Sequence, residues 1–136
     1  MSTLPFGDNP LVVPPSGIEL RDYQRAALES LDAWFGANST GHPLVVVPTG
    51  GGKSVILAEF IRQSFAGYAG ARMIVATHVK ELIDQNHRTL LRCWPGAPAG
   101  IYSAGMGRRD TAHPIAFVGI QSVYQRAREF GHVDIL

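Results

Sequence analysis

The chain has 136 residues, of which 46% are hydrophobic and 17% are charged, with a formal net charge of +1 and one cysteine. This composition excludes a disordered chain, an internal disulfide framework and a protein held on nucleic acid by bulk charge alone. No apolar run reaches the ~18 residues that a membrane span needs, and the N-terminus lacks a signal-peptide pattern. We therefore expect a cytoplasmic protein without a membrane partner, in which Cys93 is a small buried hydrophobe.

The first part of the chain predicts an extended lead-in followed by a helix. Residues 1–19 are rich in proline and glycine, which favour turns over regular elements. From Leu20, apolar residues recur at helical spacing as far as Phe35, and Gly36 with Asn38 provides a stop. We therefore expect a boundary between a lead-in, 1–19, and a folded domain, 20–136.

Strand-like and helix-like stretches then alternate along the rest of the chain. The predicted strands cover residues 44–47, 72–76, 101–103, 115–120 and 133–136, and the predicted helices cover residues 55–65, 79–93 and 121–130. Polar loops are expected at 95–100 and 105–114. Such alternation with short connections is typical of an α/β fold in which helices cover both faces of a mostly parallel sheet. Ligands bind these sheets at the carboxyl ends of the strands.

The segment "PTGGGKS" follows the first predicted strand and has the features of a phosphate-binding loop. Glycines allow the backbone to close around an anionic phosphate chain, and the helix that begins there adds its positive dipole end. The strict form of this motif would have glycine in place of Val47, so only the shorter form is met. The residues predicted to hold the nucleotide here are Pro48, Thr49, Gly50, Gly51, Gly52, Lys53 and Ser54.

Two residues of this loop are predicted to take part in the chemistry. The Lys53 ammonium group would contact the β- and γ-phosphates, and the Ser54 hydroxyl would bind Mg²⁺. ATP or ADP with Mg²⁺ is therefore the expected cofactor. A phosphate loop alone does not distinguish kinases, GTPases and motors.

The stretch "LRDYQRAAL" resembles the Q motif of superfamily 2 helicases. The resemblance implies that the Gln24 amide recognises the adenine edge, with Arg21 and Tyr23 as packing partners. Without the phosphate loop, the same stretch would be interpreted as an ordinary amphipathic helix with a polar glutamine.

Three further segments resemble the nucleic-acid contacts of the same superfamily. "HVKELIDQN" resembles motif Ia, although His78 stands where many relatives have proline. "VGIQSVYQR" resembles the next strand-end segment, and "YSAGMGRRD" resembles the glycine-bearing loop between them. These resemblances imply contacts to single-stranded nucleic acid by His78, Val79, Lys80, Gln85, Gly105, Arg108, Gln121 and Ser122. The alternatives are a solvated helix face for Lys80, a helix cap for Ser122 and a plain surface loop for the arginines.

Taken together, the segments from Leu20 onward resemble the first RecA-like domain of RadD-like DNA helicases of superfamily 2. In that family a strand ending in Asp-Glu comes next, and "HVDIL" resembles its first half. We therefore expect a fragment that binds nucleotide and contacts single strands, DNA rather than RNA, but does not hydrolyse ATP without a second RecA-like domain. A P-loop small-molecule kinase and a binding-only nucleotide module are the alternatives, although no arginine-rich lid is visible for the kinase.

Overall fold

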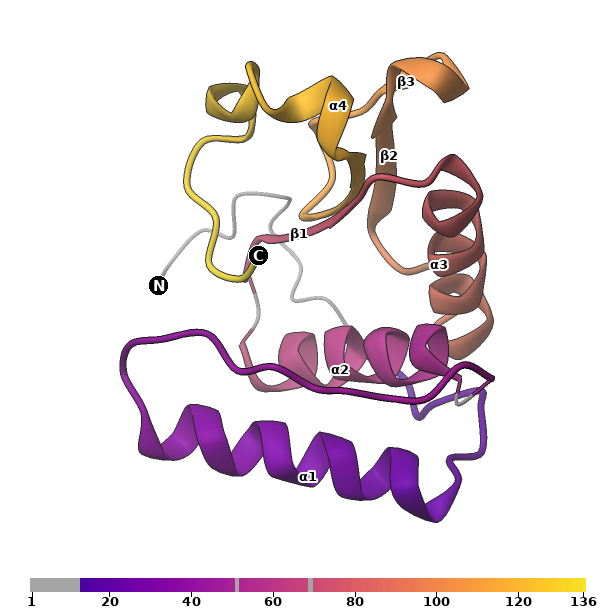
Figure 1. Cartoon of the computed structure of the whole chain (residues 1–136), viewed down its shortest axis with the longest axis vertical. Coiled ribbons are helices and arrows are strands. Elements are labelled where there is room, and N and C mark those ends of the chain that lie inside the picture. The colour runs from indigo at the N-terminus through magenta and orange to yellow at the C-terminus, as the bar shows by residue number, and fades with distance from the viewer. Residues whose placement is uncertain (1–12, 51, 69) are drawn as a thin grey trace.

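The computed structural model describes residues 13–50, 52–68 and 70–136 (Figure 1). The helices are α1 (Asp22–Ala37), α2 (Lys53–Gly67), α3 (Lys80–Cys93) and α4 (Ile120–Val123), with short 3₁₀ helices at Ala104–Met106 and Ala127–Phe130. The strands are β1 (Met73–Thr77), β2 (Ala99–Ser103), β3 (Arg108–Arg109) and β4 (Ile115–Gly119). In the described part of the chain, no helix has the length and apolarity to cross a membrane.

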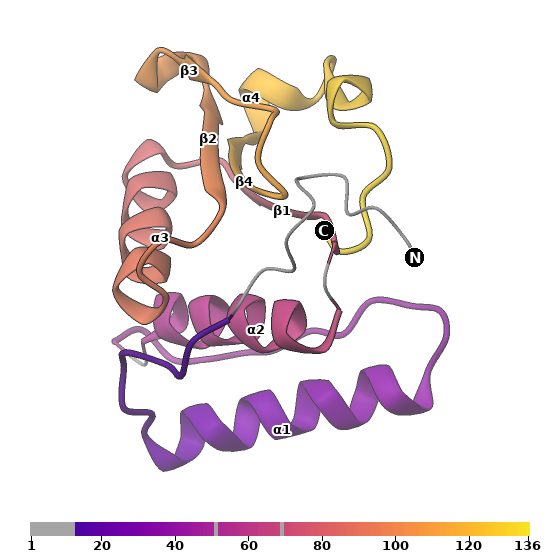
Figure 2. The same ribbon diagram turned by 180° about the vertical axis from the view of Figure 1, so that it is seen from behind.

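The described residues form a four-stranded sheet in the order β1-β4-β2-β3. Strand β4 lies between β1 and β2 and is parallel to both, whereas β3 pairs with β2 in the antiparallel sense (Figure 2). The parallel register, in which Thr77 is opposite Gly119, brings the carboxyl ends of β1, β4 and β2 to one edge. The predicted mixed α/β fold with a mostly parallel open sheet is therefore confirmed, in keeping with a RecA-like domain.

The main core lies between one face of this sheet and helices α2 and α3. Alternate residues of a strand face opposite sides, so Ile115 and Phe117 of β4 point into this core while Ala116 and Val118 point away. Helix α1 lies alongside α2 on the side away from the sheet (Figures 1 and 2). The largest buried members of the core are Ile61, Phe65, Met73, Ile83, Leu90, Trp94, Ile101, Ile115 and Phe117.

The predicted strand at residues 44–47 is wrong. These residues have no regular secondary structure, and Leu44 and Val46 are 87% and 83% exposed. A strand requires the backbone of a neighbour, and on the side of β1 away from β4 the described residues supply only an isolated parallel bridge from Ile135 to Met73. A groove of about 1120 Å³, lined by α1, residues 39–43, β1, β4 and residues 131–136, lies there instead. The β-branched residues at 44–47 favour a strand locally, but this propensity alone does not form one.

The predicted helix at 121–130 is only partly correct, because it is divided into α4 and a 3₁₀ helix with a turn between them. The second piece is bound to the sheet. The Tyr102 hydroxyl donates to Glu129 Oε2 at 2.8 Å, and the fully buried Phe130 ring packs against Tyr102 at 5.2 Å between centroids. Burying Phe130 covers the second face of the sheet. The predicted strand at 133–136 is reduced to the single bridge at Ile135.

The described end of the lead-in is anchored to the end of α3. The Gly17 N–H donates to the Cys93 carbonyl at 2.8 Å. A Cβ at position 17 would lie 2.6 Å from the Arg92 carbonyl oxygen, so the close approach requires glycine. The predictions for the helices at 20–35, 55–65 and 79–93 and for the strands at 72–76, 101–103 and 115–120 are confirmed within a few residues.

Candidate nucleotide site and nucleic-acid edge

The phosphate loop, residues 48–54, leads directly into helix α2. Gly50 and Gly52 have φ values of 82° and 73°, a left-handed backbone that side chains with a Cβ rarely adopt. Gly52 is the N-cap of α2, so the helix begins immediately at Lys53. Pro48, Thr49, Gly50 and Lys53 are exposed, and Gly51 lies outside the described residues. The local structure is thus that of a glycine turn opening a helix, as its sequence predicts.

Gln24 lies against this loop from the other side. It is 4% exposed, and its Nε2 atom lies 2.5 Å from the position that a Cβ on Gly52 would take. Its Oε1 atom accepts a hydrogen bond of 2.9 Å from the Arg21 N–H, which closes the first turn of α1. The structure therefore brings Gln24 into contact with Gly52 of the glycine turn, although the two residues are far apart in the sequence. Arg21 and Tyr23 are exposed beside it.

Ser54 is joined to helix α3. Its hydroxyl donates to Asn86 Oδ1 at 3.0 Å, and both residues are half-buried. A serine hydroxyl that donates its hydrogen bond to Asn86 keeps the lone pairs of its oxygen for a hard cation, which favours oxygen ligands. The donor set thus fits Mg²⁺ at Ser54, with Asn86 behind it. The sequence offered one signal for Asn86, because it is a polar residue on the same face of α3 as Ile83 and Leu90.

The segments predicted to contact nucleic acid meet at the edge where β1, β2 and β4 end, which we call the strand-end edge. The Ala104 N–H, just after β2, donates to the Ser122 hydroxyl at 2.9 Å, just after β4. A Cβ on Gly105 would lie 4.0 Å from Lys80 Cδ, at the start of α3 after β1. The exposed members of the predicted set are His78, Lys80, Gln85, Gly105, Arg108 and Gln121.

Ser122 and Val79 are the half-buried members of this set, and both have local structural roles. Ser122 joins two strand ends through its bond to Ala104, rather than capping its helix. Val79 is the N-cap of α3, and its N–H donates to Thr77 Oγ1 at 3.1 Å. These two residues shape the strand-end edge, whereas the other six residues of the set are exposed to solvent.

A comparison with known protein families matches residues 17–133 to the type III restriction enzyme, res subunit. The chain belongs to this family. The res-subunit match extends from just before α1 to the segment that follows Phe130, so it includes the phosphate loop, Gln24 and the strand-end edge. It supports a superfamily 2 helicase motor domain and a helicase-type nucleotide-binding domain. No curated protein matches the chain.

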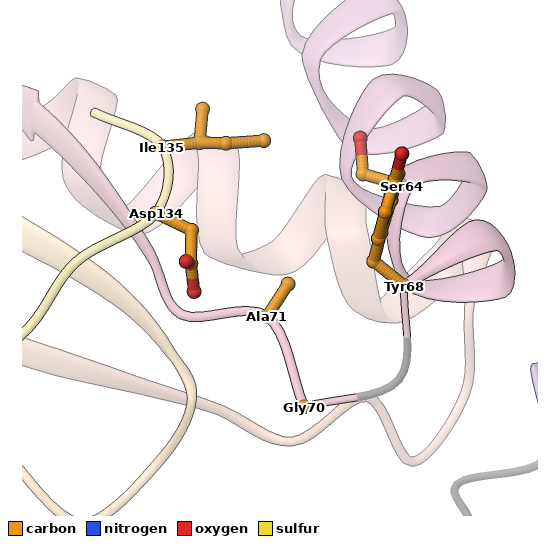
Figure 3. Close-up of a pocket in the computed structure, with 6 residues that line it drawn as sticks. All are labelled: Ser64, Tyr68, Gly70, Ala71, Asp134 and Ile135. Carbon is orange, nitrogen blue, oxygen red and sulfur yellow. The ribbon is translucent and has the colours of Figure 1, made fainter.

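A smaller cavity of about 390 Å³ lies at the other end of α2 in this res-subunit domain (Figure 3). It is bounded by Ser64 in the last turn of α2, by Tyr68 just after that helix, and by Asp134 and Ile135. Asp134 Oδ2 accepts the Arg72 N–H at 2.8 Å, so this carboxylate is used to hold the chain beside β1. The cavity is therefore separate from the phosphate loop, which opens the first turn of α2.

Proposed function

We propose that this chain is the ATP-binding portion of an ATP-dependent DNA helicase or translocase of superfamily 2, similar to the RadD-like proteins. The observation that supports it most directly is the contact between Gln24 and Gly52. A glutamine that recognises adenine must lie near the loop that holds the phosphates, and the closeness of Gln24 to Gly52 supports that role for it. The res-subunit family match is consistent with this arrangement.

In the proposed binding mode, each part of the site has a separate task. The loop from Pro48 to Gly52 surrounds the phosphates with backbone N–H groups, and Lys53 supplies the positive charge. The Ser54 hydroxyl is the protein ligand for Mg²⁺. Gln24 contacts the adenine edge.

Arg21 and Tyr23 flank Gln24 on the first turn of α1. Both are exposed beside the Q motif. We propose that their side chains pack around the base.

The strand-end edge is the proposed site for the backbone of a single strand. Lys80 and Arg108 would neutralise phosphates, and His78, Gln85 and Gln121 would donate to phosphate or sugar oxygens. Gly105 would allow the backbone to approach closely. Such contacts fix position without selecting a base sequence, which suits a motor that moves along a strand.

We further propose that ATP turnover requires a second RecA-like domain acting with this one. Phosphoryl transfer depends on positioned charge, including a carboxylate on the metal and an arginine finger. In this structure the Ser54 hydroxyl donates a hydrogen bond to the amide oxygen of Asn86, not to a carboxylate. The carboxylate of α2, Glu59, is bound to Arg62 through Oε2 at 3.0 Å. The isolated chain is therefore expected to bind ADP or ATP and to show only background hydrolysis.

Nucleotide selectivity tests the proposal. Calorimetric titration of the 136-residue chain should give an affinity for ADP about tenfold or more above that for GDP, because guanine presents the wrong edge to Gln24. Gln24→Ala should abolish this preference and leave pyrophosphate binding nearly unchanged. Gln125→Ala, at an exposed glutamine beyond α4, is the matched control. Equal ADP and GDP affinities in the unaltered chain would contradict the assignment of Gln24.

A further inference from the structure

We propose that Asn86 is a positioning residue that orients the Ser54 hydroxyl for Mg²⁺. This inference rests on the proposed function and adds a residue that the motifs do not assign. It begins from the hydrogen bond of 3.0 Å in which Ser54 Oγ donates to Asn86 Oδ1. The bond joins the first turn of α2 to the middle of α3, across residues 32 positions apart.

The two helices do not depend on this bond for their packing. Most of their contact lies farther along both helices, where Ile61 and Phe65 of α2 and Leu90 and Cys93 of α3 are buried and Cys93 is hydrogen-bonded to Glu59. Ser54 and Asn86 instead lie half-buried at the rim, beside the phosphate loop. One hydrogen bond at that rim adds little to the stability of a fold, so its position next to the loop is the more informative property.

The chemistry of a serine ligand explains why the acceptor matters. A hydroxyl has one proton and two lone pairs, and it rotates freely unless its proton has a partner. With the proton directed to Asn86, the lone pairs are directed away from α3. Mg²⁺ requires near-ideal octahedral geometry, so a ligand already held in one orientation binds it with less loss of freedom.

The position of Asn86 also connects two parts of the proposed motor. Asn86 follows Gln85 directly, and α3 begins at Lys80 on the strand-end edge. The Ser54 hydroxyl is therefore held by the helix that leads away from the proposed nucleic-acid contacts. Among the described residues, the side chain of Asn86 accepts the hydrogen bond of Ser54, so Asn86 is the residue to substitute.

The test compares ADP affinity with Mg²⁺ and with EDTA, by calorimetry on the 136-residue chain. Asn86→Leu should lower the magnesium-dependent gain in affinity roughly two- to tenfold, the effect of one hydrogen bond, and leave the affinity in EDTA unchanged. In a Ser54→Ala background, Asn86→Leu should have no further effect, because its partner is gone. Asn86→Asp, which keeps an acceptor oxygen, should retain most of the gain.

Arg88→Leu is the matched control, because Arg88 is exposed on α3 and pairs with Asp84 instead. If Asn86→Leu does not fold, Asn86→Ala serves for the same comparison. Equal losses with Mg²⁺ and EDTA, or an Asn86 effect that persists without Ser54, would overturn this inference and leave the nucleotide site standing. Absence of ADP binding by the unaltered chain in both buffers would overturn the proposed function and this inference together.

Discussion

A buried carboxylate holds the lead-in, α2 and α3 together at the level of single residues. Glu59 is 2% exposed, and Arg62 Nε and Cys93 Sγ both donate to its Oε2 at 3.0 Å. Burial alone would raise the pKa of Glu59, but hydrogen bonds from Arg62, Cys93, Ser16 and Gln63 lower that pKa to about 2. Burial raises the pKa of the Cys93 thiol to about 11, helped by the same carboxylate. Cys93 is buried as the sequence suggests, but it is also a donor.

This carboxylate predicts how stability changes with acid. Because its pKa is lowered on folding, Glu59 stabilises the fold above about pH 4.5 and loses that contribution as the pH falls toward about 2. Urea unfolding should show a loss of a few kcal/mol across this window. Glu59→Gln should be less stable at pH 7 and show a flatter profile between pH 4.5 and 2.

The control for this profile is Glu29→Gln, at an exposed position of α1. It should keep the stability of the unaltered chain at pH 7 and the same slope below pH 4.5. A Glu59→Gln profile as steep as that of the unaltered chain would show that other groups cause the acid sensitivity.

Residues that bond across elements were the hardest part of the site to predict. The glycine turn could be predicted because its chemistry is local, and Gln24 could be assigned only through a resemblance. The contact of Gln24 with Gly52 and the bond of Ser54 to Asn86 depend on how α1 and α3 pack on α2. No spacing along the chain encodes such contacts, since they arise from tertiary packing.

At the scale of elements, the phosphate loop joins an exposed segment to a helix that is packed in the core. Helix α2 begins at the loop and packs into the core through Ile61 and Phe65. Residues 44–47 lead into the loop and pair with no described strand, and Leu44, Val45 and Val46 among them are exposed. Local propensity favours a strand there, but strand formation needs a partner in the right place. A helix, by contrast, makes its backbone hydrogen bonds within itself, so periodicity predicted α2 and α3 well.

The exposure of Val46 predicts that the fold tolerates a charged side chain at this position. Val46→Lys should change the unfolding free energy by no more than about 0.5 kcal/mol, because its side chain is 83% exposed. Thermal unfolding followed by circular dichroism measures the change. Ile101→Ala is the comparison variant, since this fully buried side chain should cost about 2–5 kcal/mol. A loss for Val46→Lys as large as for Ile101→Ala would show that residues 44–47 are buried.

At the scale of the whole molecule, the fold separates the two surfaces for which we propose functions on one α/β domain. The nucleotide loop lies at the start of α2, and the strand-end edge gathers segments that follow β1, β2 and β4. The parallel direction of these strands could be predicted from the alternation of elements, whereas their order in the sheet comes from the structure. The division of residues 121–130 could not, because it depends on the burial of Phe130 against Tyr102.

The strand-end edge predicts weak binding of single strands that depends on salt. Fluorescence anisotropy with a labelled oligonucleotide should show binding at low salt without preference among base sequences. The log–log salt slope should be shallow, because few phosphates are contacted. Arg108→Ala should weaken binding and reduce this slope by about one. Arg25→Ala, on the exposed face of α1, is the control. No binding at low salt, or strong preference for one sequence, would contradict the proposal.

The central claim is that residues 48–54 bind the phosphates of an adenine nucleotide, and one titration tests it most directly. ADP with Mg²⁺ is titrated into the 136-residue chain and into Lys53→Ala. Lys53 is exposed at the start of α2, so its removal should leave the fold intact. We predict saturable binding to the unaltered chain at one site and a loss of tenfold or more for Lys53→Ala. Binding of equal strength in both proteins would contradict the account, because the nucleotide would then be held elsewhere.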